Sequence, residues 1–314
     1  MAATITLAQS IAFAQTFAGF KSLNIGANNE PAITAGNIVL QTILGPPFGW
    51  NWNRTSSVSL ITTTAGMQDY PVAAATFGWL EKADYRIPSA NITNTALTSG
   101  TATYTATNVF QVGDLVTVTG TTNGSGIFNV SQAMIASATS SQFTININSG
   151  NVGSASDTGV ATVGKTTEIS QIVNVLGSGT ELSSPANIAP QLDDNTGNIT
   201  FRLLPIPDRV YTIGTIWQNR IPALMSSLSS TWAPVPDHYS FIYQAGFTAL
   251  MLAYAHDAKW QQFNQQFIAR LLSTSEGWNQ DQKNVFLNTW LMQTEQMQAQ
   301  NLLTAQGAQA RGSQ

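Results

Sequence analysis

The feature that most constrains this chain is a run from Asp237 to Asp257 that has no polar face. It reads DHYSFIYQAGFTALMLAYAHD, with apolar or small side chains at most positions. Asp237 follows Pro236 directly, a position typical of a helix N-cap, so we predict that a helix begins here. A helix without a polar face must be covered on several sides by a large core, by a membrane or by other subunits.

The apolar part of this run is too short to cross a membrane. It extends from Phe241 to Ala255 and contains Gln244, whereas a spanning helix needs about 20 apolar residues. A single small domain rarely covers a helix on all sides. The run therefore predicts that identical copies of the chain enclose this helix.

Composition excludes several classes of protein. The chain has 314 residues and 43% hydrophobic content, which is enough to bury a core and leaves room for two domains. Only 9% of its residues are charged, far below the roughly 25% that is usual. The formal net charge of -4 supplies no basic field for holding nucleic acid. The absence of cysteine excludes disulfides and thiolate chemistry.

The middle of the chain differs from both flanks. Residues 89–164 are dominated by Thr, Ser, Gly and Asn, and their only charges are Asp114 and Asp157. Short alternating runs recur there, which predicts an inserted all-β module, either a sandwich or a small barrel. Its predicted strands are Ala102–Ala106, Leu115–Thr119, Gly126–Val130, Phe143–Ile147 and Val160–Val163.

Residues 1–88 and 165–306 flank this insert, and we predict that they form one host domain. Helices are expected over 4–18, 33–44 and 237–257, and Trp260, Phe263, Phe267 and Leu271 mark the apolar face of another. Phe286, Trp290, Gln293 and Met297 indicate a glutamine-rich helix near the end, and 307–314 are expected to be a flexible tail. The expected fold class is α+β, with a helical bundle and a small antiparallel sheet interrupted by the all-β insert.

The strands of the host predict two local pairings. Val58–Thr62 and Tyr70–Val72 are separated by a turn-forming segment that contains Gly66, which favours a hairpin. Val210–Trp217 is expected to pair with Ile199–Leu204, the strand that precedes it.

Catalytic patterns are almost absent from the sequence. Residues 159–166 read GVATVGKT and match the phosphate-loop pattern, but strand-like residues surround them, where that loop needs a helix beginning at Lys165. We interpret them as a strand that returns from the insert to the host. The two histidines, His238 and His256, lie at opposite ends of one helix and cannot share a metal. We therefore expect no enzyme activity, no metal and no cofactor.

Several motifs lie outside the insert and together resemble a known family. They are a Trp50-x-Trp52 corner, Ala65-Gly66-x-Gln68-Asp69-Tyr70-Pro71, Leu204-Pro205-x-Pro207-Asp208 with Tyr211, and Pro234-x-Pro236-Asp237-x-Tyr239 before a helix rich in small residues. This combination resembles the head-to-tail adaptor proteins of short-tailed bacteriophages. The likeness covers roughly residues 1–88 and 165–300, and its motifs are structural turns with no catalytic role.

The resemblance implies a virion protein of the phage neck, assembled in the host cytoplasm. It implies a dodecameric ring below the portal protein that carries the tail nozzle and fibres, with DNA passing through its lumen without specific binding and with no membrane. The candidate subunit or partner interface is Trp217, Trp232, Ala245, Gly246, Ala249, Ala253, Met297, Leu302 and Leu303.

Two alternatives remain open at this point. Tryptophans usually pack in cores, and for Trp217 and Trp232 a core position and an interface position are equally compatible with the sequence. The alternative function is a host-surface or carbohydrate-binding virion protein that acts through the β insert.

Overall fold

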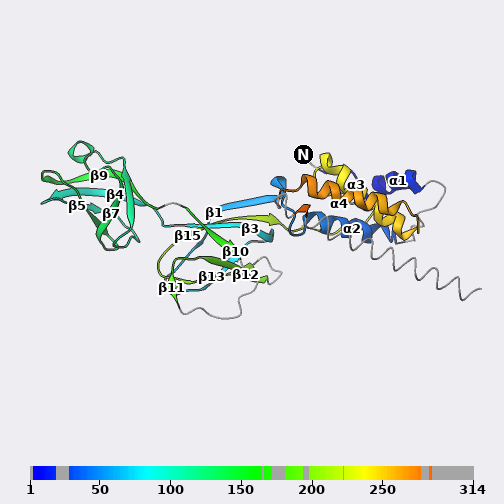
Figure 1. The fold of residues 1–314 in the computed structure, drawn as a ribbon, viewed down its shortest axis with the longest axis horizontal. Helices are drawn as coiled ribbons and strands as arrows, with labels where there is room; N and C mark the ends of the chain where they lie inside the picture. Colours follow the sequence, from blue (N-terminus) through cyan, green and yellow to red (C-terminus); the bar gives the residue numbers. More distant parts are fainter. Residues whose placement is uncertain are drawn as a thin grey trace, which may run out of the picture. The chain divides into compact units, whose positions relative to one another are not determined.

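The computed structural model describes residues 3–18, 28–164, 166–171, 181–193, 198–221, 223–276 and 283–284. The chain divides into two units: Met1–Arg54 with Gln218–Gln314, and Thr55–Trp217. The first holds the helices and one hydrophobic core, while the second holds two further cores, one in an open sheet and one in a closed barrel (Figure 1).

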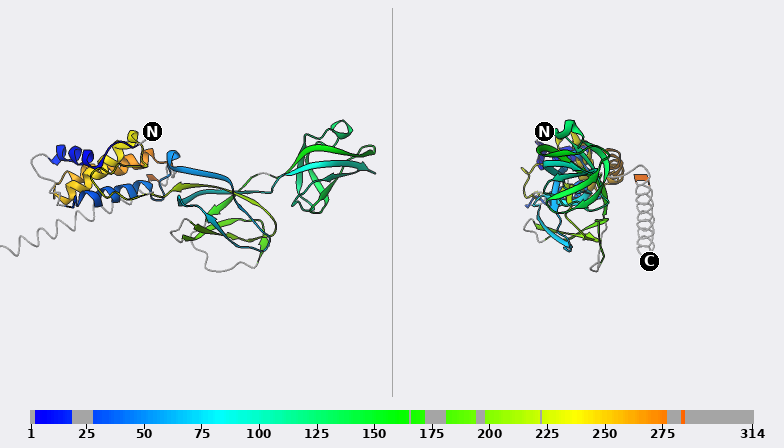
Figure 2. Two further views of the ribbon diagram at one scale, coloured as in Figure 1. Left: turned by 180° about the vertical axis from the view of Figure 1, so that it is seen from behind. Right: turned by 90° about the vertical axis from the view of Figure 1, so that its left-hand side faces the viewer.

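The helical unit is built from both ends of the chain. Its elements are α1 (Leu7–Ala18), α2 (Ala32–Leu44), the 3-10 turns η1 (Asn51–Asn53) and η3 (Asp237–Tyr239), α3 (Ser240–Tyr254) and α4 (Trp260–Thr274). α1, α2 and α4 all pack against α3, and the two views in Figures 1 and 2 agree on this arrangement. The helices predicted over 4–18 and 33–44, and the one beginning at Trp260, are thereby confirmed.

The apolar helix α3 is enclosed within a single chain. Nine of its residues are buried, among them Tyr243, Phe247 and Leu252, so the expectation that only neighbouring copies could cover this helix is wrong. Hydrophobic periodicity shows that a helix needs cover. It does not show whether that cover comes from distant segments of the same chain.

Asp237 holds the N-terminal segment in place and does not act as an N-cap. Its carboxylate accepts hydrogen bonds from the Thr4 amide at 2.9 Å, the Thr4 hydroxyl at 2.5 Å and the Ile5 amide at 3.3 Å. Its side chain makes no capping bond to η3, which begins at this residue. The hydrogen bond from the Thr4 hydroxyl is the main reason that the pKa of Asp237 lies below its ordinary value.

The open sheet has seven strands in the order β1-β15-β3-β10-β12-β13-β2. These are β1 (Arg54–Thr62), β2 (Asp69–Ala73), β3 (Phe77–Arg86), β10 (Thr167–Gln171), β12 (Asn187–Asp193), β13 (Asn198–Leu204) and β15 (Thr212–Asn219). A separate parallel pair joins β11 (Leu182–Ser183) to β14 (Ile206–Pro207). The sheet is mostly antiparallel, but β10 and β12 run parallel.

The predicted hairpin between β1 and β2 is wrong. These strands stand at opposite ends of the strand order, and β2 pairs with β13 in a register that places Tyr70 opposite Phe201. A bidentate ion pair fixes this register, with Arg202 donating to Asp69 at 2.7 and 2.8 Å. The turn chemistry around Gly66 is real, but it forms a loop in which the Tyr70 hydroxyl bonds the Met67 carbonyl.

The predicted pairing of β15 with β13 is also wrong. β15 lies between β1 and β3. Its burial pattern has five of eight positions buried, which is typical of a central strand covered on both faces. Neighbours in sequence often pair, but β15 finds both of its partners among strands much earlier in the chain.

The barrel is closed by six antiparallel strands in the order β4-β5-β8-β7-β6-β9. They are β4 (Ala90–Thr98), β5 (Thr101–Thr105), β6 (Leu115–Thr119), β7 (Val130–Ala138), β8 (Gln142–Asn146) and β9 (Val152–Val163). Buried and accessible positions mostly alternate along β4, β5, β6 and β8, so most apolar side chains point inward and most threonines point outward, while Thr95 is buried and Leu115 is exposed. Inside, Tyr104 stacks on Phe143 with ring centroids 4.8 Å apart.

One strand predicted in the barrel is misplaced. The segment predicted as Gly126–Val130 follows the 3-10 turn η2 (Asn123–Gly126), and the strand β7 begins only at Val130. Gly124 and Gly126 have φ values of 57° and 80°, a left-handed conformation that suits the turn before the strand.

The predicted fold class is contradicted. Strands cover more of the described chain than helices do, and the sheet of the host has seven strands with a core of its own. The host is therefore not a helical bundle that carries a small sheet. The sequence shows most of the individual strands, but a strand's neighbours in a sheet are set by long-range contacts that periodicity does not contain.

Asp157 is a buried acceptor that joins three parts of the barrel. Its carboxylate accepts hydrogen bonds from the Thr95 hydroxyl at 2.9 Å, the Thr122 amide at 2.8 Å and the Thr158 amide at 2.8 Å. Burial raises the pKa of this carboxyl group, but these hydrogen bonds, with one from the Asn123 amide, lower it by more. The pKa of Asp157 therefore lies below its ordinary value, which means that the ionised form stabilises the barrel.

We predict that Asp157→Asn lowers the stability of the barrel by about 3 kcal/mol at neutral pH, since buried amide donors lose a charged acceptor. Because the folded-state pKa is depressed, this stabilisation is present above the unfolded value near 4 and is lost as the pH falls. Hydrogen exchange of the barrel amides should show the difference between the two proteins shrink below about pH 4. Glu168→Gln, at an exposed position on β10, is the control and should change nothing. A difference that stays constant with pH would contradict this role of Asp157.

Candidate functional site

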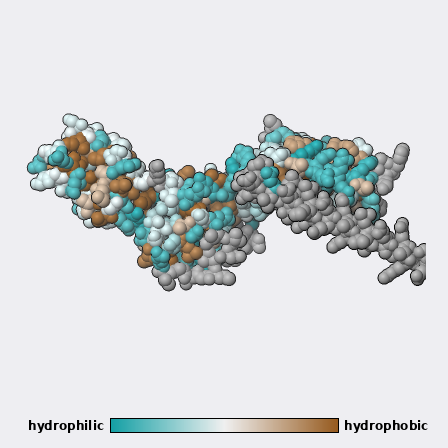
Figure 3. Space-filling view, in the orientation of Figure 1, coloured by the Kyte–Doolittle hydropathy of each residue, from teal (hydrophilic) through white to brown (hydrophobic). Residues whose placement is uncertain are grey.

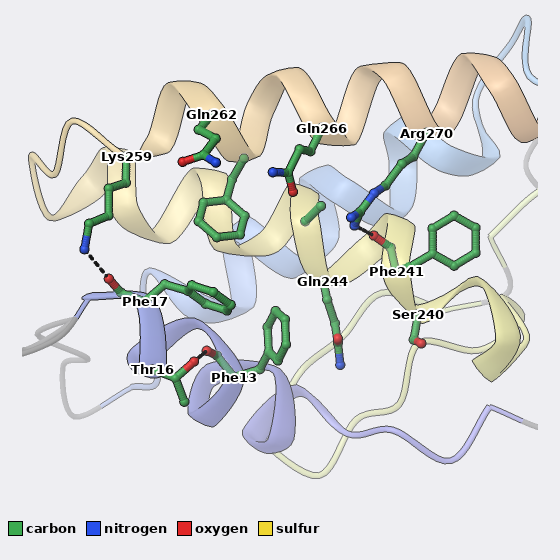
Figure 4. A pocket seen from close by; sticks show the side chains of 12 residues that line it. Phe13, Thr16, Phe17, Ser240, Phe241, Gln244, Lys259, Gln262, Gln266 and Arg270 are labelled. Carbon is green, nitrogen blue, oxygen red and sulfur yellow. Dashed lines mark hydrogen bonds between the residues drawn. The ribbon is translucent and has the colours of Figure 1, made fainter.

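The helical unit contains an open groove of about 640 Å³ between α1 and α4, above the start of α3 (Figure 4). We call it the phenylalanine groove. Residues from these helices and from the turn before α4 line it: Phe13, Thr16, Phe17, Ser240, Phe241, Gln244, Ala245, Lys259, Gln262, Phe263, Gln266 and Arg270.

Aromatic rings form the apolar part of the groove. The ring of Phe17 packs edge-on against Phe13 at 5.1 Å and against Phe263 at 4.8 Å. Phe17 and Phe241 remain 36% and 41% exposed. Exposed aromatic rings beside polar amides are typical of surfaces that bind another chain.

Lys259 and Arg270 supply positive charge at separate points along the groove. The Lys259 ammonium donates to the Phe17 carbonyl at 2.9 Å, and the Arg270 guanidinium donates to the Phe241 carbonyl at 2.5 Å and lies 5.8 Å from the Phe241 ring (Figure 4). These acceptors are neutral, and none of the lining residues is acidic. The described lining of the groove therefore carries positive charge along an aromatic and amide-rich surface.

The groove is suited to binding more than to covalent chemistry. Its lining combines phenylalanine, glutamine, Lys and Arg, and it includes no carboxylate or imidazole that could serve as a general base near neutral pH. Within the described ranges, no three His, Cys, Asp or Glu side chains gather closely enough to hold a metal ion. Among the described helices, none has the length and apolar character to cross a membrane.

The predicted interface residues on α3 are largely covered by their own chain. Ala245 and Ala249 are 2% and 3% exposed, and Gly246 lies so close to α4 that an added Cβ would approach the Phe267 ring to 2.9 Å. Ala253 is half-buried. Only Ala245 borders the groove, so the small residues serve the close packing of α3 on α4.

The two predicted tryptophans lie in separate cores. Trp232 is fully buried in the helical unit, where it stacks on Tyr243 at 4.5 Å and donates to the Ser10 hydroxyl at 2.8 Å. Trp217 is buried in the core of the open sheet. Met297, Leu302 and Leu303, with the predicted glutamine-rich helix, lie outside the described residues.

Motif residues from distant parts of the chain meet in the helical unit. The rings of Trp50 and Trp52 lie 5.4 and 5.8 Å from the ring of Tyr239, and the Trp50 indole donates to the Ile43 carbonyl at 2.7 Å. Tyr211, from another motif, donates to the Asp208 carboxylate at 2.7 Å within the second unit. The contacts of Trp50, Trp52 and Tyr239 join segments that are far apart in the sequence, and Tyr211 stabilises its own loop.

The phosphate-loop pattern has no phosphate-loop structure. Gly159–Val163 lie in strand β9, Gly164 follows with φ of 68°, and the next element is strand β10, which begins at Thr167. No helix begins among the described residues of this segment, so their amides lack the helix N-terminus on which a phosphate loop depends. Lys165 lies outside the described residues.

Sequence reasoning missed the groove itself. Phe13 and Phe17 are four residues apart and therefore share a helix face. That spacing was a usable signal, but it does not distinguish a core face from a groove wall. The positions of Lys259 and Arg270 depend on how α4 packs, which the sequence pattern does not contain.

Comparisons with known proteins give little information. No family model matches the chain, and no curated protein matches it. Among solved structures, Phage phi92 endosialidase is similar at 20% identity, with a TM-score of 0.19, over 39% of this chain and 19% of that chain. This chain thus spans about a fifth of that protein, and so low a TM-score supports no argument about fold or function.

We predict that Gly246→Val destabilises the helical unit by about 2–3 kcal/mol, because the larger side chain would force α3 and Phe267 apart. Urea denaturation followed by circular dichroism measures the change. Ala253→Val, in the same helix at a half-buried position, should cost less than about 1 kcal/mol, mainly through helix propensity. Equal stabilities of the two variants would contradict the close contact between α3 and α4.

Proposed function

We propose that the chain is a structural virion protein of a short-tailed bacteriophage, which assembles into a ring that joins the portal to the tail. In this proposal the helical unit makes the contacts between subunits, and the barrel is an additional module inserted into the sheet. DNA passes through the ring without specific binding, consistent with the formal net charge of -4.

The observation that carries the proposal is the convergence of the motif residues. Trp50, Trp52 and Tyr239 belong to two motifs that are far apart in sequence, yet their rings form one cluster. Asp237, from the second of these motifs, binds the N-terminal segment through Thr4. Two motifs that resemble the adaptor family thus come together in one place. This supports an adaptor-like architecture more strongly than motifs that lie apart would.

Exposed apolar residues on the helical unit offer a surface for assembly. Ile38 on α2 and Leu224 are 46% and 55% exposed. Asn37, the neighbour of Ile38, exchanges hydrogen bonds of 2.7 and 3.1 Å with the backbone of Met225, the neighbour of Leu224. The two apolar side chains thus belong to segments that are fastened together, which would let them act as one contact.

We predict that the purified full-length chain forms rings of uniform size, visible by electron microscopy of negatively stained particles and as one heavy species in analytical ultracentrifugation. Ile38→Glu should weaken assembly at least tenfold, because it places a charge in an apolar contact. Gln41→Glu, at an exposed position one turn along α2, is the matched control and should assemble normally. A protein that stays monomeric at all concentrations and does not bind capsid vertices would refute the adaptor role.

A second candidate function rests on the outside of the barrel. Leu115 and Met134 face one another across β6 and β7 and are 51% and 64% exposed, and nearby Val112 is 68% exposed. Figure 3 shows hydrophobic areas on the barrel's surface beside hydrophilic ones. Such residues favour a role of the barrel in binding a host-surface molecule.

Deletion of residues 89–164 distinguishes the two functions. Since β4 and β9 are neighbours in the barrel, the ends of the deleted segment lie close together and a short Gly-Ser linker can join them. The adaptor role predicts that the shortened chain still forms rings and still binds capsid vertices. The binding role predicts that attachment to host cells is lost, and Met134→Ser should then weaken attachment on its own. Loss of rings with retained attachment would contradict both roles.

A further inference from the structure

The phenylalanine groove has the chemistry of a surface that holds an amphipathic helix. Exposed Phe17 and Phe241 supply apolar contact area, Gln244, Gln262 and Gln266 supply amides, and Lys259 and Arg270 supply positive charge in a lining that contains no acidic side chain among the described residues. A suitable occupant therefore combines apolar and amide side chains with a negative charge. Grooves of this kind recognise helices through anchors spaced three or four residues apart.

The chain itself contains such a sequence outside the described residues. Residues 285–303, which we call the C-terminal segment, read VFLNTWLMQTEQMQAQNLL. At helical spacing, Leu287, Leu291, Gln298 and Leu302 fall on one face together with Glu295. Glu295 is the only charged residue of this segment, so its one charge lies among the leucines and is opposite in sign to the groove.

The chain reaches the end of α4 just before the C-terminal segment begins, about 7.5 Å along the helix from the groove residue Arg270. Lys283 donates to the Ser275 carbonyl at 2.7 Å, which places the chain beside the end of α4 just before this segment. Lys259 and Arg270 are about 16 Å apart along α4, since each helical residue adds about 1.5 Å. A helix that runs back along α4 from Ser275 is long enough to cover this distance, and it would bring Glu295 between the two cations.

From these observations we infer that the phenylalanine groove binds the C-terminal segment of its own chain, through the face that carries Leu287, Leu291 and Leu302, with Glu295 between Lys259 and Arg270. Attachment in the same chain favours this occupant over a free partner, because a short connection gives an effective concentration in the millimolar range. Such docking needs no second copy and is independent of ring formation.

The absence of native cysteine allows a direct test in the full-length chain. Gln262 lines the groove, whereas its neighbour Gln261 does not, and a helix running back along α4 brings Gln298 near Gln262. Chains carrying Gln262→Cys with Gln298→Cys should be joined by a short bis-maleimide at least about fivefold more often than chains carrying Gln261→Cys with Gln298→Cys. Equal yields from the two pairs would overturn the inference.

Isotope labelling identifies the source of the segment. Equal amounts of unlabelled and ¹⁵N-labelled chains are mixed before cross-linking, and the products are weighed by mass spectrometry. Docking within one chain gives cross-linked monomers only. Covalent dimers that combine light and heavy chains would mean that a neighbouring copy supplies the segment, and this would overturn docking within the chain.

Charge substitutions test the part played by Glu295. Gln266→Glu in the groove, or Glu295→Lys in the segment, should each lower the cross-link yield by about threefold to fivefold, because each places like charges together. The two changes combined should restore the yield. Gln265→Glu, on α4 but outside the groove, should have no effect. If none of the charge variants changes the yield, the charged contact is refuted.

Discussion

The enclosure of α3 by helices of its own chain is the contact on which the helical unit depends. Side chains of α1, α2 and α4 cover it, and the absence of a side chain at Gly246 lets the ring of Phe267 approach its backbone. Because both ends of the chain contribute these helices, Thr4 and Ile5 must be held against the start of α3. The carboxylate of Asp237 does this with three hydrogen-bonded groups.

The same arrangement leaves one surface incompletely covered. α1 and α4 both pack near α3 but remain far enough apart to form the phenylalanine groove, where Phe17 and Phe241 stay accessible and the described lining holds two cations and no acidic side chain. Because only 9% of its residues are charged, this protein has little long-range electrostatic attraction with which to select a partner. Shape, exposed aromatic rings and a small number of placed charges are therefore the features by which this unit can choose its partners.

In the second unit, the barrel and the sheet differ in how their edge strands are paired, since an edge strand leaves backbone N–H and C=O groups without partners in the sheet. Closure of β4 onto β9 removes the edges of the barrel, and the buried Asp157 holds the loop after β6 to β9. The sheet stays open, with β1 and β2 as its end strands. An ion pair of 2.6 Å between Arg209, which precedes β15, and Asp114, which precedes β6, joins the two parts within this unit.

Most helices and strands can be located from the amino-acid pattern, because hydrophobic periodicity and turn residues act over a few neighbours. This pattern identified α1, α2 and α4, and it showed that α3 must be covered. What covers α3, why β1 and β2 do not pair, and how Lys259 and Arg270 reach the backbone carbonyls of Phe17 and Phe241 follow from the tertiary structure alone. These are contacts between residues far apart in the chain, such as Thr4 with Asp237 or Asp69 with Arg202, and no local pattern specifies them.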